Sequence, residues 1–327
     1  MRIDNPSTAF EHWAHRYIQH MKALGRRFFH DTWMIDRLCR FLADNHAADL
    51  DRTLFEKWCI THQAMHANVR RTHQRVVRKL CLYRQRTETD CFVPDASRFP
   101  RRQPSRAPVI LHPSDIARLL DAADALKVHG AVPLRPAMIR LAVVLLYTAG
   151  LRRGELLRLR LGDVDPTDGT VMIHETKFYK SRLVPLSTDA QGEIRAYLKQ
   201  RLAAPWDVST EAPLIGGHQH SHAIHEYSNT TIGRALHELC ITAGVQDADG
   251  RLPRVHDFRH SFAVQALLRW YRNGADVQAC LPKLAMYMGH VSIASTAYYL
   301  HWIPEVAYTA SGRFERRYGH LIAGEPS

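Results

Sequence analysis

The sequence lacks any long hydrophobic run. Its longest uninterrupted apolar stretch, Leu141 to Tyr147, falls far short of the roughly 20 residues that a membrane-spanning helix requires. The first ten residues, MRIDNPSTAF, contain no apolar segment of the kind found in secretory signals. We therefore expect a cytoplasmic protein without a membrane-spanning segment.

Cysteine is scarce, and its six occurrences are scattered without a CxxC pair or a regular spacing. This pattern argues against a disulfide framework and a zinc finger, and it favours reduced, mostly buried thiols. One His-rich stretch, GGHQHSHAIHEY, offers the residue type of a transition-metal site at His218, His220, His222 and His225. Such loops are more often unliganded, so we assign no metal and no cofactor, and leave metal binding by this loop open.

Acidic residues are too few to balance the basic ones. Lys and Arg number 44 and Asp and Glu 32, which gives a formal net charge of +12. Residues 1 to 106 contain 20 basic and 11 acidic residues, which leaves only +3 for the rest of the chain. A basic surplus attracts polyanions such as DNA or RNA, although a merely soluble basic surface has the same composition.

The N-terminal part has the pattern of a small helical bundle, which we place at residues 1–93. Trp13, Tyr17 and Met21 recur at four-residue spacing between charged residues. A helix over residues 69 to 86 combines an apolar stripe with arginines that have few acidic neighbours, so its basic face is expected either to contact DNA phosphates or simply to be solvated. The candidate DNA contacts on this helix are Arg70, Arg71, Arg75, Arg78 and Lys79.

Residues 94–108, PDASRFPRRQPSRAP, are predicted to form an interdomain linker. They hold four prolines and four arginines and little that could pack. A basic connector of this kind is suited to wrapping around a duplex, so Arg101 and Arg102 are further candidate DNA contacts.

The second domain, residues 109–303, is predicted to be mainly helical with a small β component, an α+β fold. Its first helix is expected to begin near Ser114, and a buried helix runs from Pro136 to Thr148 and ends at Gly150. Two β-prone runs in GTVMIHETKFYKSRLVPL indicate a hairpin. Further helices are expected at residues 229–243, 256–270 and 283–288, and residues 304–327 form a C-terminal tail.

Several chemically capable residues stand in a specific order in this second domain. Arg152 follows the end of the buried helix. The hairpin turn carries Lys177, whose long side chain can reach a bound backbone, and Lys180 and Arg182 compete with it for that role. The segment HDFRH places His256 and Arg259 three residues apart, on one face of a helix. Further on, MGHVSIASTAYYLH places His290 nine residues before Tyr299. Each of these residues alone has an ordinary explanation as a surface charge or a core aromatic, and only the combination indicates a site.

This combination resembles the tyrosine recombinases, the family of phage and transposon integrases and Xer resolvases. AGLRRGELLRLRLGDVD is similar to the family's first arginine box and TKFYKSRLVPL to its lysine hairpin. HDFRHSFA matches the HxxR box, and MGHVSIASTAYYLH the box that ends in the nucleophile. The four motifs span the second domain in the usual order, whereas the N-terminal region is similar to the family's helical core-binding (SAM-like) domain only in length, position and charge.

The resemblance implies a role for each matching residue. It makes Tyr299 the nucleophile, with register from His290 favouring it over the adjacent Tyr298, and it makes Glu155 an acidic residue that orients the first arginine. The other implied catalytic residues are Arg152 and Arg259, which hold the phosphate, Lys177, which protonates the leaving 5′ oxygen, His256, the acid/base toward the tyrosine, and His290, which hydrogen-bonds the phosphate. Lys180 and Arg182 are candidate DNA contacts. Two guanidiniums suit this chemistry because they stabilise the charge of an attacked phosphate without any metal.

The implied activity is site-specific recombination through a 3′-phosphotyrosine intermediate, which integrates or excises a mobile element. The implied partners are double-stranded DNA with inverted-repeat core sites, further copies of the chain as a dimer on each site and a tetramer in the synapse, and accessory DNA-bending proteins or sister recombinases. The resemblance also implies that the tail at residues 304–327 is exchanged between protomers of the tetramer. Such a protein works at the nucleoid. Two alternatives stay open, namely a catalytically silent DNA-binding or bridging protein of the same fold, and a type IB topoisomerase-like enzyme that relaxes DNA.

Overall fold

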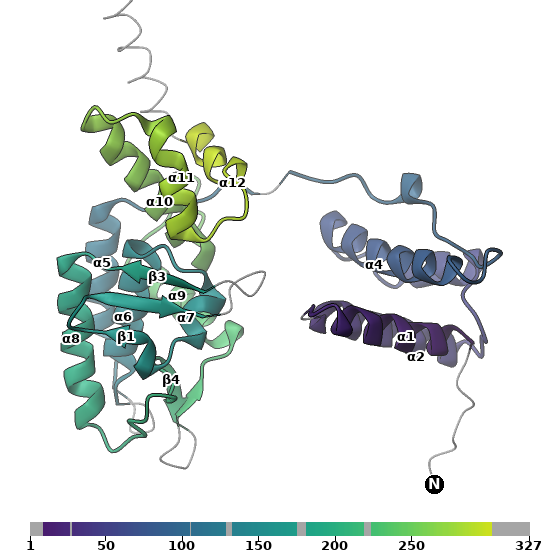
Figure 1. Ribbon diagram of the computed structural model, residues 1–327, viewed down its shortest axis with the longest axis horizontal. Helices are drawn as coiled ribbons and strands as arrows, with labels where there is room; N and C mark the ends of the chain where they lie inside the picture. The colour runs from purple at the N-terminus through teal and green to yellow at the C-terminus, as the bar shows by residue number, and fades with distance from the viewer. Residues whose placement is uncertain are drawn as a thin grey trace, which may run out of the picture. The chain divides into compact units, whose positions relative to one another are not determined.

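The computed structural model describes residues 9–26, 28–104, 106–128, 133–174, 181–218 and 224–302. The chain divides into two compact units, Met1–Arg106 and Ala107–Ser327, each with a hydrophobic core of its own (Figure 1). Within the described ranges, no helix is both long and apolar enough to cross a membrane.

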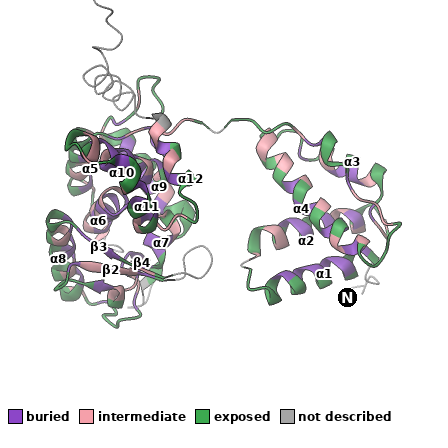
Figure 2. Cartoon of the chain, turned by 45° about the horizontal axis from the view of Figure 1, so that its top comes forward, coloured by how far each residue is buried: buried purple, intermediate pink, exposed green. Residues whose placement is uncertain are grey.

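The N-terminal unit is the predicted helical bundle. Its helices are α1 (Ala9–Ala23), α2 (Phe29–Asp44), α3 (Arg52–Ile60) and α4 (Ala67–Gln85). Residues that recur every three or four positions, such as Trp13, Tyr17 and Met21, form one buried face of α1. Figure 2 shows these buried faces as stripes along the helices, and the opposite faces are exposed.

The segment predicted to be a linker packs on this unit instead of standing free. Phe99 is buried in the core of the N-terminal unit, next to the short 3-10 helix Ala96–Arg98. Asn68 of α4 exchanges two hydrogen bonds of 2.9 Å with the backbone of Gln103. The prediction of a connector over residues 94–108 with little that packs was therefore wrong for its first ten residues.

The C-terminal unit is mainly helical, as predicted. Its helices are α5 (Pro113–Asp124), α6 (Arg135–Thr148), α7 (Arg153–Arg158), α8 (Thr188–Ala203), α9 (Asn229–Thr242), α10 (Val255–Arg272), α11 (Val277–Met288) and α12 (Ala294–Ala297), with 3-10 helices at Leu161–Asp163 and Tyr298–Trp302. Helix α6 is apolar on nearly all sides because it lies at the centre, in contact with α5, α8 and α10. Figure 1 shows α10, α11 and α12 gathered at one end of this unit.

The predicted hairpin forms part of a small antiparallel sheet, β1-β2-β3. Strand β2 (Thr170–Ile173) pairs with β1 (Val164–Asp165) on one side and with β3 (Arg182–Pro185) on the other. A second pair consists of β4 (Gly216–His218) and β5 (Ile224–Glu226). The turn between β2 and β3, which carries Lys177 and Lys180, lies outside the described residues.

Aspartates stabilise the starts of two of the helices that begin earlier than predicted. The carboxylate of Asp115 accepts the His112 N–H at 2.8 Å, so α5 starts at Pro113 and not at a Ser114 cap. The side chain of Asp276 accepts the backbone N–H groups of Gln278 and Ala279, so α11 starts six residues before the predicted Lys283. Its proline, Pro282, lies inside the helix.

Candidate active site

Five of the six predicted catalytic residues meet at one place in the C-terminal unit. Arg152 is the residue before α7, His256 and Arg259 lie on α10, His290 follows α11, and Tyr299 lies in the 3-10 helix after α12. The contacts described below join these elements into one site. The sixth residue, Lys177, belongs to the hairpin turn outside the described ranges.

Arg259 is almost fully buried, with 1% of its surface exposed. Its Nη1 donates to the carbonyl of Gly150, and its Nη2 donates to the carbonyl of Met288 at 2.6 Å. Burial and the neighbouring charge of Arg152 lower the pKa of Arg259 to about 10. The guanidinium therefore keeps its positive charge at neutral pH, although it is surrounded by protein.

Arg152 is held by a buried carboxylate. Its Nη1 donates to Glu155 Oε1 at 2.6 Å and its Nη2 to the carbonyl of Gly289 at 2.6 Å. Arg182 also donates to Glu155 with both terminal nitrogens, at 3.0 and 2.8 Å. Burial alone would raise the pKa of Glu155, but the guanidiniums of Arg182 and Arg152 outweigh burial and hold this pKa at about 2. The arrangement fits the orienting role predicted for Glu155.

Two glycines supply carbonyls to these arginines from the ends of helices. Gly150 follows α6 with φ of 59° and Gly289 follows α11 with φ of 66°, in the left-handed region that favours glycine. A Cβ on Gly289 would lie 2.8 Å from Nη1 of Arg182. Carbonyls at helix C-termini carry partial negative charge, so the two helix ends help to fix the guanidiniums.

Tyr299 is buried beside the two arginines, with 3% of its surface exposed. Burial raises the pKa of its phenol, while Arg259 and Arg152 act in the opposite direction. Its ring packs edge-on against His260 at 5.3 Å between centroids, and nearly parallel to His290 at 6.1 Å. Tyr298, in contrast, is 41% exposed.

Two histidines, His260 and His290, pack against the Tyr299 ring, and a third, His256, packs against His260 at 4.6 Å between ring centroids; all three have lowered pKa values. Desolvation by the surrounding protein and the charge of Arg259 lower the pKa of His256, although the residue is exposed. Burial lowers the pKa of both His260 and His290 to about 4. The Nδ1 of His290 lies 2.8 Å from Oγ1 of Thr296. All three rings are therefore neutral at neutral pH and able to accept or donate hydrogen bonds.

Two residues of this site were not predicted from the sequence, and a third, Arg182, was predicted in a different role. His260 lies four residues after His256, a spacing that alone signals a shared helix face, and Thr296 carried no signal. Arg182 was a candidate DNA contact, but only 12% of its side chain is exposed, because it binds Glu155 and the carbonyl of Tyr287. Its position makes it part of the support for Arg152.

The other candidate DNA contacts differ in burial and in their partners. Arg71 donates to the carbonyl of Pro100 at 2.9 Å and Arg78 to that of Pro94, so both hold the packed segment against α4. Arg70 is half-buried, and its Nε has no partner among the described residues. The exposed cations are Arg75, Lys79, Arg101 and Arg102. Lys180 lies outside the described residues.

The His-rich stretch is only partly described. His220 and His222 fall outside the described ranges, and His225 is exposed on β5. Among the residues that the structure does describe, no cluster of three or more histidine, cysteine or acidic side chains is arranged to hold a metal.

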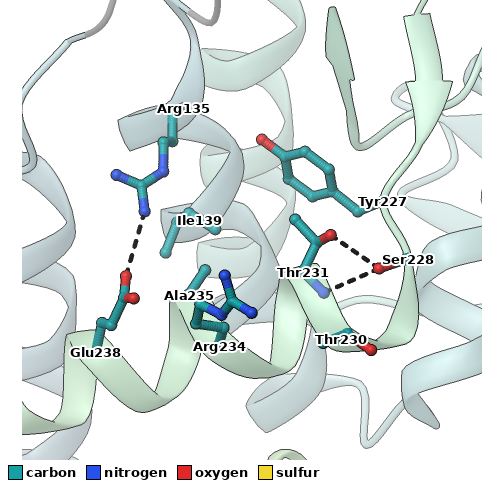
Figure 3. A pocket seen from close by; sticks show the side chains of 9 residues that line it. All are labelled: Arg135, Ile139, Tyr227, Ser228, Thr230, Thr231, Arg234, Ala235 and Glu238. Carbon is teal, nitrogen blue, oxygen red and sulfur yellow. Dashed lines mark hydrogen bonds and ion pairs between the residues drawn. The ribbon is translucent and has the colours of Figure 1, made fainter.

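A separate hollow of about 270 Å³ lies between the start of α9 and the start of α6 (Figure 3). Arg135 reaches Glu238 across it at 3.7 Å, and Ser228 caps α9 by accepting the Thr231 N–H at 3.0 Å. Arg234 also lines it, but none of the predicted catalytic residues does. The hollow is therefore distinct from the site around Tyr299.

Comparison with known proteins covers most of the chain. Residues 110–305 match the model described as "Phage integrase family". The chain is 31% identical over 286 residues to the "Putative integrase/recombinase y4rE" of Sinorhizobium fredii, covering 87% of this chain and 89% of the relative. It is also 30% identical over 320 residues to "Putative integrase/recombinase y4rB" of the same organism, covering 95% and 98%.

Solved structures share the fold at lower identity. A XerH site-specific recombinase bound to palindromic difH substrate matches with a TM-score of 0.63 at 15% identity, over 96% of this chain and 98% of the other. The Tn1549 transposon integrase in complex with circular intermediate DNA matches with a TM-score of 0.63 at 17% identity, over 92% and 99%.

Proposed function

Because the chain belongs to the phage integrase family and is a site-specific DNA recombinase, we propose that Tyr299 is its nucleophile. The observation that carries this proposal is the position of the buried Tyr299 phenol beside Arg152 and Arg259: burial raises the pKa of the phenol, and these two cations oppose that rise. A phenol with a pKa of about 10 is a poor nucleophile at neutral pH unless nearby cations favour the phenolate. Tyr298 lies largely outside this environment.

The proposed reaction conserves the number of phosphodiester bonds. The Tyr299 oxygen bonds to the scissile phosphorus, and the bond from phosphorus to the 5′ oxygen of the next nucleotide breaks. The phenolic proton goes to His256, whose neutral ring is a suitable base. A proton reaches the leaving oxygen from Lys177, the role that the family resemblance implies. A 5′ hydroxyl of a second strand then reverses these steps, so rejoining needs no ATP.

The two arginines are arranged to hold the attacked phosphate. Each guanidinium has five N–H donors, and the bonds from Arg259 and Arg152 to protein carbonyls and to Glu155 use two donors apiece. The remaining donors can bind the non-bridging oxygens while the protein bonds keep the guanidiniums fixed. Fixed donors of this kind stabilise a charged transition state because they need no reorganisation during the reaction.

DNA is the partner of this enzyme. We propose that it acts on inverted-repeat core sites, as a dimer on each site and a tetramer in the synapse, on a mobile element and at the nucleoid in the cytoplasm. Accessory DNA-bending proteins or sister recombinases belong to the same proposal. Residues 304–327, the predicted tail exchanged between protomers, lie outside the described residues.

A test is covalent trapping with nicked duplexes from the ends of the protein's own element. The wild-type chain and Tyr298→Phe should both form a covalent protein–DNA adduct that survives denaturation, whereas Tyr299→Phe should bind DNA and form none. An adduct with Tyr299→Phe would assign the attack to another residue. Tight binding of every end without any adduct would favour the catalytically silent alternative, and relaxation of supercoiled DNA without partner exchange would favour the topoisomerase-like one.

A further inference from the structure

Thr296 places a buried hydroxyl in the active site. It lies in α12 with none of its surface exposed, and its Oγ1 is 2.8 Å from Nδ1 of His290. Threonines in other helices, such as Thr72 and Thr148, donate this hydroxyl to the carbonyl four residues earlier. Among the described residues, no carbonyl accepts a hydrogen bond from Thr296 Oγ1, which leaves His290 Nδ1 as the acceptor within reach of its proton.

This hydrogen bond decides which ring nitrogen of His290 carries a proton. Burial and the guanidiniums of Arg259 and Arg152 hold the pKa of His290 at about 4, so the ring is neutral at neutral pH and has one N–H. If that proton were on Nδ1, the buried Thr296 hydroxyl would lose its acceptor, which is unfavourable. With the proton on Nε2, the Thr296 hydroxyl donates to Nδ1, and the Nε2–H is left as a donor for the phosphate.

We propose that Thr296 is a positioning residue, which fixes His290 as the Nε2–H tautomer and presents it as a hydrogen-bond donor to the phosphate. This inference rests on the proposed function. The same bond fixes the plane of the ring, which lies nearly parallel to the Tyr299 ring, with 20° between the two planes. Without it, the ring is free to flip or to take the other tautomer, which would turn an unprotonated nitrogen toward an anionic oxygen.

The catalytic test compares Thr296→Val, which keeps the shape and removes the hydroxyl, with Thr296→Ser, which keeps the hydroxyl. In single-turnover trapping, we expect Thr296→Val to slow adduct formation by about 10- to 100-fold, since complete loss of one fixed donor costs about 10²- to 10³-fold. Thr296→Ser should restore most of the rate, and DNA affinity should be unchanged in both. Equal rates in Thr296→Val and wild type would overturn the proposal.

A double variant separates positioning from a general structural role. The side-chain amide of His290→Gln supplies a donor near the position of Nε2 and needs no threonine to set its tautomer. In this background, Thr296→Val should have little further effect on the rate. If Thr296→Val reduces the rate of adduct formation as strongly in the His290→Gln background as in the wild type, Thr296 acts by packing and the proposal is contradicted.

A spectroscopic test does not depend on catalysis. Long-range nitrogen–proton spectra of the full chain with labelled histidine, assigned with His290→Gln, should show His290 as the Nε2–H tautomer in wild type and Thr296→Ser. In Thr296→Val, the Nδ1–H tautomer should appear. A wild-type Nδ1–H tautomer would refute the inference even if recombination is confirmed. The expected tautomers together with no adduct from any variant would refute the proposed function alone.

Discussion

The basic residues of the two units are held in opposite ways. In the C-terminal unit, Arg152, Arg182 and Arg259 are bound to carbonyls at helix ends and to one buried carboxylate. On α4 of the N-terminal unit, Arg75 and Lys79 extend from an exposed face. Both sets attract phosphate, but a fixed guanidinium selects one geometry, whereas a mobile cation contributes affinity at any phosphate within reach. We therefore expect the fixed arginines of the C-terminal unit to serve catalysis, and the exposed cations of α4 to serve DNA affinity.

The largest expected effect concerns Arg259. Lysine keeps the charge but cannot bind the Gly150 and Met288 carbonyls and a phosphate in one rigid plane. We expect Arg259→Lys to reduce the single-turnover rate of adduct formation by about 10²- to 10³-fold, with DNA affinity changed far less. Arg269→Lys, at an exposed position of the same helix, should leave the rate unchanged. A wild-type rate in Arg259→Lys would show that the planar geometry of the guanidinium is not required for adduct formation.

The second effect tests the shared carboxylate. Glu155→Gln removes the charge that separates the guanidiniums of Arg152 and Arg182, and leaves two cations close together in a buried site. The free energy of unfolding of the C-terminal unit should fall by about 3 kcal/mol, because breaking a buried pair leaves an uncompensated charge. Denaturant titration measures this change. Glu193→Gln, which removes a more exposed pair with Arg140, should cost clearly less, and equal losses would contradict the account.

The third effect is a loss of stability in acid. The pKa values of His260 and His290 are about 4 in the folded protein and near 6.5 when the chain is unfolded, so the unfolded state binds more protons between these values. The free energy of unfolding is therefore not reduced by these histidines above about pH 6.5, and it decreases as the pH falls from 6.5 toward 4. The protection factors of the α10 amides, which correct for the intrinsic pH dependence of hydrogen exchange, should fall across this range. His290→Gln should reduce the pH dependence, and an unchanged pH dependence would argue against a neutral buried ring.

The smallest effect concerns the exposed cations of α4. If Arg75 and Lys79 contact phosphates, the double alanine variant should weaken DNA binding and lower the slope of log K against log salt by about 2, roughly 0.9 for each contact. The rate of adduct formation at saturating protein should stay unchanged. Lys57→Ala, at an exposed position of α3, serves as the control. A reduced rate of adduct formation at saturating protein would show that Arg75 and Lys79 also contribute to catalysis, which would contradict the account.

The sequence predicted the parts of this site that depend on local pattern. The helices, the β2–β3 hairpin and the positions of Arg152, His256, Arg259, His290 and Tyr299 follow from periodicity and from ordered motifs. The placement of Arg182 could not be predicted, because its partners, Glu155 and Tyr287, are distant in sequence. The packing of Phe99 likewise depends on tertiary contacts with the N-terminal core. The local sequence of residues 94–103 therefore predicts an interdomain linker and not a packed segment.

Direct mapping of the attachment point tests the central claim most closely. The covalent adduct formed on a nicked duplex is digested with protease and nuclease, and tandem mass spectrometry identifies the tyrosine that carries the residual nucleotide. We predict that the nucleotide is bound through its 3′ phosphate to Tyr299. A nucleotide on Tyr298, or on any residue other than Tyr299, would contradict the account.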